Sequence, residues 1–321
     1  MIKTLKFIQG AISTKDFVPS LTHFHIKGGI IQGYNGVIAL NSTIPLNINC
    51  SPNASNFIKA IDKCTEVVEL KLMKSKLNIK SGSFKANINC LDDEFEHLQP
   101  EGTFVSIDGD KLLQAFRTLS PLMGFDASRL WTNGILLKNG GAFATNNVIA
   151  ARYDIGAIFP FVINIPSIAI KEILRIKEIP VNLQITDRHV TFHYTEGRWL
   201  RSSLYVNEWP DLDALIGDSI SDPEIGENFY TGLDSIQSFA SDINSVYFKD
   251  GTMSTSLNPD ESEATYDMQS INFEAVYNVK MLQLLKGIAT SMDLSKYPNP
   301  GTFKGDNVKG VIIGLRMPTN A

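Results

Sequence analysis

The sequence has little cysteine and none of the common catalytic signatures. Its three cysteines, Cys50, Cys64 and Cys90, stand far apart with no Cys-x-x-Cys pair, which argues against a zinc site or a disulfide framework and favours a reducing cytoplasm. No stretch approaches the run of about 18 apolar residues that a membrane helix needs, and the N-terminal segment is unlike a signal peptide. A P-loop, a Gly-x-Gly-x-x-Gly turn, a nucleophile elbow and a His-Glu-x-x-His motif are all missing. We therefore expect a cytoplasmic protein that is not an enzyme, has no membrane contact, and uses no cofactor and no metal.

Length and composition indicate a multidomain globular protein. The chain has 321 residues, of which 43% are hydrophobic and 20% charged, so two or three domains can each bury a core. The net charge of −5 counts against nucleic-acid binding on average. An acidic protein can still gather its cations on one surface, so their distribution decides the question.

One order of elements occurs three times along the chain: a short amphipathic helix, strands with Gly or Asn turns, a second amphipathic helix, and more strands. The copies recur about 110 residues apart, the length of a repeated domain rather than of a solenoid repeat. The first helix of each copy is expected at 7–11, 112–116 and 235–239. The second is expected at 56–61, 169–174 and 281–285.

Alternating apolar residues between and after these helices predict antiparallel strands. Turn signals fall at Gly28-Gly29, at Asn139-Gly140-Gly141 and at Asp250-Gly251. Two short helices with many strands give each copy an α+β fold. We predict three domains, 1–98, 99–212 and 213–321, with boundaries where acidic residues, Pro and Gly concentrate.

Five segments, in this order, resemble the bacterial beta sliding clamp. Segment 103–123 is similar to the strand and helix that open the second clamp domain, and 130–136 to its aromatic-x-Asn-Gly-x-Leu strand. Segment 144–150 stands in the place of Ala-Thr-Asp-Gly-His-Arg-Leu, and 208–212 resembles the Phe-Pro-Asp-Tyr element before domain three. Segment 310–317 is similar to the C-terminal Tyr-Val-Val-Met-Pro-Met-Arg-Leu strand.

The resemblance implies a ring of six such domains, made by a head-to-tail homodimer with helices lining the hole and sheets outside. The implied function is a DNA sliding clamp, or processivity factor, that encircles duplex DNA without reading its sequence. Its implied partners are DNA polymerase and a clamp loader. Cellular and phage origins both stay open. The alternative hypothesis is a non-enzymatic structural ring or virion protein built of repeated α+β domains. A third hypothesis is a hydrolase with an unrecognised site.

Basic residues at matching helical positions are the expected DNA contacts. Lys59 and Lys63 stand four residues apart beside the apolar stripe of one second helix, and Lys171 and Arg175 occupy the equivalent positions in the next copy. The third copy matches more loosely. The full set is Lys59, Lys63, Lys111, Arg117, Arg129, Lys171, Arg175, Lys177, Lys280 and Lys286.

The resemblance also places a partner-peptide pocket between the second and third domains. It consists of Thr132, Thr145, Asn147, Val148, Ile149, Ala150, Val311, Ile313, Gly314, Leu315 and Arg316. The family's Asp-Gly-His-Arg is replaced here by Asn146-Asn147-Val148-Ile149, and its Met-Pro-Met by Ile313-Gly314-Leu315. We therefore expect an apolar groove with its own peptide preference. The departure at the other end of the chain is that the N-terminus leaves room for only a short opening strand before the first helix.

Two histidine pairs could suggest a metal site, but the sequence does not support one. His23 and His25 share one face of an expected strand, and His189 and His193 lie in another. No third ligand accompanies either pair, so both are interpreted as ordinary exposed or hydrogen-bonded histidines.

Overall fold

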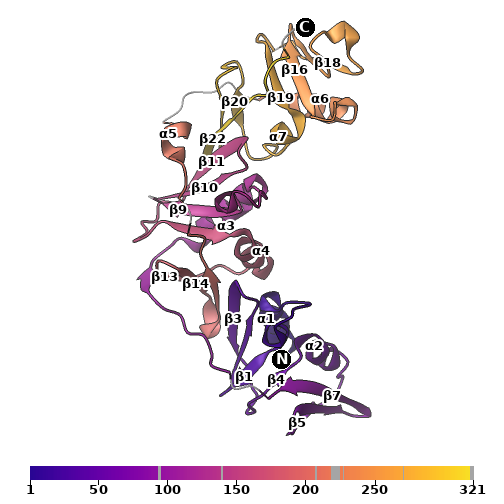
Figure 1. Cartoon of the computed structure of the whole chain (residues 1–321), viewed down its shortest axis with the longest axis vertical. Helices are drawn as coiled ribbons and strands as arrows, with labels where there is room; N and C mark the ends of the chain where they lie inside the picture. Colours follow the sequence, from indigo (N-terminus) through magenta and orange to yellow (C-terminus); the bar gives the residue numbers. More distant parts are fainter. Residues whose placement is uncertain are drawn as a thin grey trace. The chain divides into compact units, whose positions relative to one another are not determined.

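The computed structural model describes residues 1–92, 95–138, 140–206, 208–217, 225–226, 228–269 and 271–318. It forms two compact units, each coloured along the sequence in Figure 1. The first unit contains Met1–Leu113 and Phe159–Val206, and the second contains Gln114–Ile158 and Asn207–Ala321. The middle repeat of the sequence is thus divided between the two units.

The helices confirm the threefold repeat. The first helices are α1 (Ile2–Ile8), α3 (Gly109–Leu119) and α6 (Asn228–Ile236). Each runs into a 3-10 turn, at Gln9–Ala11, Ser120–Leu122 and Gln237–Phe239. The second helices are α2 (Ala54–Asp62), α4 (Ser167–Ile176) and α7 (Val279–Gln283). The short opening strand expected before α1 is absent from the described residues, because α1 already begins at Ile2.

The first unit is built on a seven-stranded antiparallel sheet. Its order is β1-β2-β3-β15-β14-β13-β8. The strands are β1 (His25–Lys27), β2 (Ile30–Tyr34), β3 (Ile38–Thr43), β8 (Thr103–Val105), β13 (Asn182–Ile185), β14 (His189–His193) and β15 (Trp199–Ser203). In the same unit, β12 (Ile163–Pro166) leads directly into α4.

A second, four-stranded sheet of the first unit has the order β4-β7-β6-β5. Its strands are β4 (Ser51–Pro52), β5 (Glu69–Met73), β6 (Lys76–Ser81) and β7 (Phe84–Leu91). Helix α1 packs on β2 and β3, α2 packs on β7, and the two helices contact each other (Figure 1). Phe57 and Ile61 of α2 are buried in this layer, each contributing about 2 kcal/mol of hydrophobic stabilisation.

The second unit also contains two sheets. The larger follows β9-β10-β11-β22-β21-β20 and the smaller β18-β17-β16-β19. The larger consists of β9 (Gly134–Lys138), β10 (Gly141–Thr145), β11 (Ile149–Asp154), β20 (Ser291–Asp293), β21 (Gly301–Gly305) and β22 (Val308–Ile312). The smaller consists of β16 (Ser245–Lys249), β17 (Thr252–Ser254), β18 (Thr265–Asp267) and β19 (Ala275–Asn278). Helix α6 packs on β17 and β18, and α7 on β19.

Strand pairing across the repeat boundaries explains why the chain divides into two units rather than three. Strand β3 of the first repeat pairs with β15 of the second, with Leu40 opposite Leu200. Strand β11 of the second repeat pairs with β22 of the third, with Ala150 opposite Val311. The backbone hydrogen bonds of each sheet therefore continue from one repeat into the next. The predicted hairpin turns at Gly28-Gly29 and Asp250-Gly251 are confirmed by the pairing of the strands on either side, whereas Asn139 of the third turn lies outside the described residues.

Candidate functional site

Helix α2 presents two lysines of the first repeat on its solvent side. The side chain of Asn53 caps the helix by accepting a hydrogen bond from the Asn56 N–H at 3.1 Å. Phe57 and Ile61 face the core, whereas Lys59 and Lys63 are exposed. Among the residues that the structure describes, neither lysine is within ion-pair distance of a carboxylate. Their charge is therefore available to an anionic ligand.

The matching position on α4, Arg175, is engaged in an ion pair. The Arg175 guanidinium lies against Glu172, whose side chain is only 8% exposed, with Nε at 2.8 Å from Oε2. Its Nη2 also donates to the carbonyl oxygen of Phe7 at 3.0 Å. Hydrogen bonding to the Glu172 carboxylate raises the pKa of Arg175, so the guanidinium keeps its charge. Arg175 thus neutralises a buried carboxylate inside the first unit, a role that its likeness to Lys63 did not reveal.

The remaining cations of the first unit lie near Arg175 in sequence or on the start of α3. Lys171 and Lys177 are exposed, and Lys177 ends α4 in a left-handed conformation with φ 60°. Lys111 is half-buried at the start of α3, where its N–H donates to the Asp108 carboxylate at 3.0 Å. Lys171 and Lys177 therefore lie on the surface, whereas Lys111 is partly covered.

The basic residues of the second unit are more often paired. Lys286 forms a 2.8 Å ion pair with Asp234 on α6, so the acidic first helix of the third repeat cancels part of the charge beside α7. Arg129 donates to the side-chain oxygen of Asn147 at 3.0 Å. Arg117 and Lys280 are exposed, and no described carboxylate lies within 4.0 Å of either. The third repeat is therefore the weakest candidate for binding an anion.

A turn between β10 and β11 carries Asn147 and Val148, two of the residues expected to bind a partner peptide. The side-chain oxygen of Asn146 accepts hydrogen bonds from the N–H groups of Val148 and Ile149, at 3.1 and 2.8 Å. Asn147 has φ 70°, a left-handed conformation that asparagine tolerates better than most residues. The turn presents Val148 beside the end of β22, where the Ile313 N–H donates to the Val148 carbonyl oxygen at 2.9 Å.

The C-terminal segment lies beside this turn. The hydroxyl of Tyr297 donates to the Leu315 carbonyl oxygen at 2.8 Å and accepts from the Met317 N–H at 2.9 Å. Ile313 is 45% exposed, Gly314 and Leu315 are half-buried, and Arg316 is exposed. The turn and the C-terminal segment, which carry most of the residues expected to bind a peptide, are therefore neighbours within the second unit.

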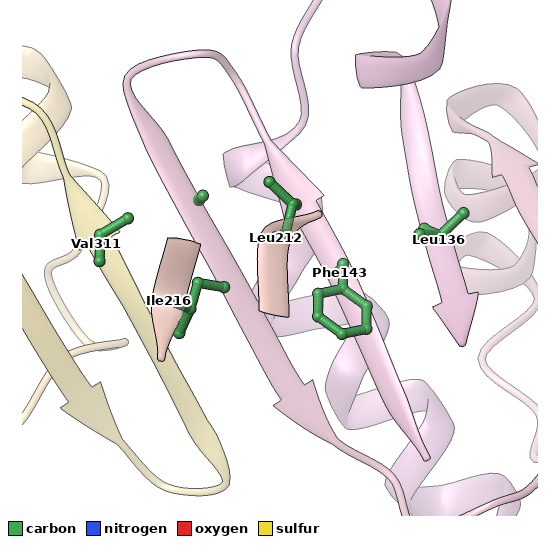
Figure 2. Close-up of a cluster of buried hydrophobic side chains, with 6 residues drawn as sticks. Leu136, Phe143, Leu212, Ile216 and Val311 are labelled. Atoms are coloured by element: carbon green, nitrogen blue, oxygen red, sulfur yellow. The ribbon is translucent and has the colours of Figure 1, made fainter. Parts of the chain in front are cut away.

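Several other residues that were expected to bind the peptide are buried and not accessible to it. Thr132, Thr145, Ile149, Ala150 and Val311 are all buried. Figure 2 shows Val311 in one cluster with Leu136, Phe143, Leu212 and Ile216. Of the residues expected to bind a peptide, the accessible ones are therefore Asn147, Val148 and segment 313–316.

Helix α5 (Leu212–Ile216) is the element that sequence reasoning missed. Asp211 caps it by accepting from the Ala214 N–H, and Leu212 and Ile216, one helical turn apart, lie on β11 and β22 (Figure 2). Arg152 bonds Asp213 at 3.0 Å, and the Lys309 ammonium donates to the Gly217 carbonyl oxygen at 2.7 Å. The i,i+4 apolar pair behind an aspartate cap was the available signal, and it was interpreted only as the end of the second domain.

His25 and His193 have hydrogen-bond partners on neighbouring strands. His25 is buried and its Nδ1 lies 3.1 Å from the Ser51 hydroxyl, while His193 Nε2 lies 3.1 Å from Gln184 Oε1. Within the described part of the chain, no group of three or more His, Cys, Asp or Glu side chains could hold a metal ion, and no helix is both long and apolar enough to cross a membrane.

Solved structures of bacterial sliding clamps are similar to this chain. No protein-family model matches the sequence, and no curated protein matches it. The Caulobacter crescentus beta sliding clamp is similar with a TM-score of 0.84 and 17% identity over 98% of this chain and 97% of that one. The Bacillus subtilis DNA polymerase sliding clamp has a TM-score of 0.82 and 19% identity over 99% and 97%. The Helicobacter pylori beta clamp bound to a DNA ligase peptide has a TM-score of 0.80 and 14% identity over 98% and 97%. The chain therefore has the sliding-clamp fold along nearly its whole length.

Proposed function

We propose that this chain, which folds as the bacterial beta sliding clamps do, is itself a sliding clamp that encircles duplex DNA and tethers the replicative polymerase in the cytoplasm. It does no chemistry of its own. The observation that carries the proposal is the threefold repeat of one α+β unit with sheets that continue across the repeat boundaries, in a fold shared over 98% of the chain. Such a chain supplies half of a six-unit ring.

Ring closure is supported by two free sheet edges of opposite charge. Strand β5 is one edge of its sheet, and segment 69–85 around it carries five lysines against one glutamate. Strand β18 is an edge in the second unit, and segment 257–267 carries four acidic residues and no basic one. An unpaired edge strand is a template for pairing with another chain. We infer that β5 of one copy pairs with β18 of a second copy, and two such contacts close a head-to-tail homodimer.

Contacts to DNA are assigned to the exposed cations of the helices. Lys59 and Lys63 are the strongest candidates, with Lys111, Arg117, Lys171, Lys177 and Lys280 contributing. A few lysines that reach phosphates and no base edges hold the duplex without reading its sequence, and this allows sliding. Arg175, Lys286 and Arg129 contribute less because each is bonded to a neighbouring side chain.

The peptide pocket is assigned to the polymerase and the clamp loader. The walls at Val148 and at segment 313–316 are apolar enough to take an extended peptide with a few anchoring side chains. The Helicobacter pylori clamp of the same fold is bound to a DNA ligase peptide, so the fold is known to carry a peptide site.

Solution mass and retention on DNA test the proposal together. We expect light scattering at micromolar concentration to give a dimer, and loaded protein to stay on nicked circular DNA but to leave after linearisation. Leu72→Asp on the β5 edge should give monomers, whereas Phe17→Asp, on a fully exposed loop residue, should leave the dimer intact. A monomeric or trimeric wild type contradicts the ring. A dimer retained equally on circular and linear DNA, or on neither, favours the structural-ring alternative.

A further inference from the structure

Two of the three cysteines lie on neighbouring strands of the first unit. Strand β4 pairs with β7 so that Pro52 stands opposite Cys90. Side chains alternate between the two faces of a strand, so Cys50, two residues before Pro52, points to the same face as Cys90. The backbone of Cys50 is held by two hydrogen bonds with Ile26, at 3.0 and 2.9 Å. The fold therefore fixes both thiols as diagonal neighbours on one surface.

The two thiols act on each other. A hydrogen bond with Cys50 lowers the pKa of the Cys90 thiol, although burial opposes this effect. The same hydrogen bond, followed by burial, raises the pKa of the Cys50 thiol. The two thiols are thus coupled, so that one can ionise while the other keeps its proton. A thiolate beside a protonated thiol is the arrangement in which a nucleophilic sulfur meets a resolving one.

Small solutes have access to the pair. Cys50 and Cys90 are each half-buried, and both line a cavity of about 410 Å³ that also includes Lys27, Lys74 and Asp92. Cys64 does not line this cavity, and its thiol donates to the Ala60 carbonyl oxygen of α2 at 3.2 Å. The chain therefore holds a paired, accessible site and a third cysteine that serves as an internal reference.

We propose that Cys50 and Cys90 form a redox-active dithiol that hydrogen peroxide converts into an intrachain disulfide. The Cys90 thiol first loses its proton, and its sulfur attacks one peroxide oxygen. The O–O bond breaks, Cys90 becomes a sulfenic acid, and the departing hydroxide takes up the proton to form water. The Cys50 sulfur then attacks the Cys90 sulfur, and the S–O bond breaks. The released hydroxide takes the Cys50 proton and leaves as a second water. Two thiols are oxidised and one peroxide is reduced.

The disulfide would close a loop from residue 50 to residue 90. This loop contains α2 and strands β5 to β7, so oxidation ties the two ends of the four-stranded sheet region together. A cross-link between distant residues limits the unfolded chain and raises the melting temperature. Reduction with dithiothreitol should reverse the change. The inference concerns the first unit alone and does not depend on the proposed clamp function.

Thiol counting on the full chain tests the proposal. Wild-type protein is exposed to a small molar excess of hydrogen peroxide, denatured and labelled with a maleimide. We expect the number of reactive thiols to fall from three to one, and the intact mass of the unlabelled protein to drop by about 2 Da. Peptide mapping should join the Cys50 and Cys90 peptides, while Cys64 carries the label. Dithiothreitol should restore all three. This readout uses the native sequence, so it does not depend on whether any variant folds.

Single substitutions provide the controls. Cys64→Ser should still lose both of its remaining thiols to the disulfide, whereas Cys50→Ser and Cys90→Ser should form no intrachain disulfide and show no rise in melting temperature. Retention of three free thiols in the wild type, a linkage that includes Cys64, or a linkage only between two chains overturns the proposal. Irreversible oxidation of Cys90 without a disulfide overturns it as well.

Discussion

Gln32 and Leu98 are joined by two hydrogen bonds that imitate a pair of backbone bonds in a sheet. The Gln32 side-chain nitrogen donates to the Leu98 carbonyl oxygen at 2.8 Å, and the Leu98 N–H donates to the Gln32 side-chain oxygen at 2.9 Å. Gln32 is 1% exposed, so the segment after the first repeat is held against β2 by a buried amide. Arg201 continues this attachment by pairing with Glu101 at 3.5 Å.

Gln32→Ala should therefore destabilise the first unit by about 2–3 kcal/mol, because it leaves both Leu98 groups without their partner. Urea denaturation followed by circular dichroism measures the change. Asn78→Ala removes a comparable amide bond to Asn87 on an exposed surface and should cost less than about 0.5 kcal/mol. Equal losses in the two variants would show that the Gln32 amide has no special role.

Arg175→Ala should cost about 1–3 kcal/mol of stability, because it leaves the Glu172 carboxylate buried without its cation. Solvent screens part of this ion pair, since the arginine side chain is 46% exposed. An unpaired buried carboxylate has a raised pKa in the folded state, so the loss should be larger at pH 8 than at pH 5. Thermal melts at the two pH values check this. Arg188→Ala, which removes an exposed pair with Asp187, should change little at either pH. A pH-independent loss would mean that packing, not charge, accounts for the role of Arg175.

His25 should make the protein sensitive to acid. Burial lowers the pKa of His25 from 6.5 to about 4, with the neighbouring His23 and His97 acting in the same direction and the Ser20 carbonyl opposing them. Between about pH 6.5 and 4, His25 therefore binds a proton in the unfolded chain but stays neutral in the folded chain. Stability should be constant above about pH 6.5 and should fall by about 3 kcal/mol between pH 6.5 and 4.

The measurement for His25 is urea denaturation across that pH range. His25→Gln should remove most of the dependence between pH 6.5 and 4, whereas His23→Gln should retain most of it. A smaller part should persist in both variants, because burial also lowers the pKa values of His97, His189 and His193. An acid dependence that is identical in wild type and in His25→Gln would assign it to other groups.

The exposed lysines should set the salt dependence of DNA association. A Lys59→Ala, Lys63→Ala and Lys171→Ala triple variant should weaken binding about equally for all sequences and reduce the slope of log affinity against log salt by about 2–3. Fluorescence anisotropy at several salt concentrations measures it, with light scattering to verify the dimer. A matched triple variant of Lys15, Lys138 and Lys304 removes the same charge elsewhere and should leave the slope near that of the wild type. If both triple variants behave alike, net charge rather than a defined path accounts for the binding.

The peptide pocket should prefer its own polymerase. Because Val148 and Ile149 replace a polar pair of the family, the C-terminal peptide of the polymerase from the same source should bind more tightly than a generic bacterial clamp-binding peptide. Ile313→Asp should weaken the cognate peptide at least about tenfold, since Ile313 is 45% exposed beside Val148, and Ile243→Asp, exposed in the same unit, should not. Isothermal titration calorimetry measures the affinity of each peptide for the wild type and for the two variants. Equal or tighter binding of the generic peptide would contradict the expected preference.

Local pattern was sufficient to find the repeated architecture. The apolar stripes of α2, α4 and α7 are properties of residues three and four apart, and the caps at Asn53 and Asn278 act within one helical turn. The hairpins likewise follow from alternation on both sides of short turns. These features need no knowledge of distant contacts, so the α+β class and the order of elements could be predicted from the sequence.

The tertiary structure alone decided which polar side chains have partners and which remain available. Arg175 and Lys63 occupy similar positions in the sequence pattern, yet only Arg175 meets a buried carboxylate and the carbonyl oxygen of Phe7, a residue 168 positions away. The Gln32 amide finds its partner 66 positions along the chain, and Cys50 meets Cys90 through strand pairing. Helix and strand periodicity report only which face of an element is buried. What lies against that face is set by the three-dimensional packing of segments that are far apart in sequence.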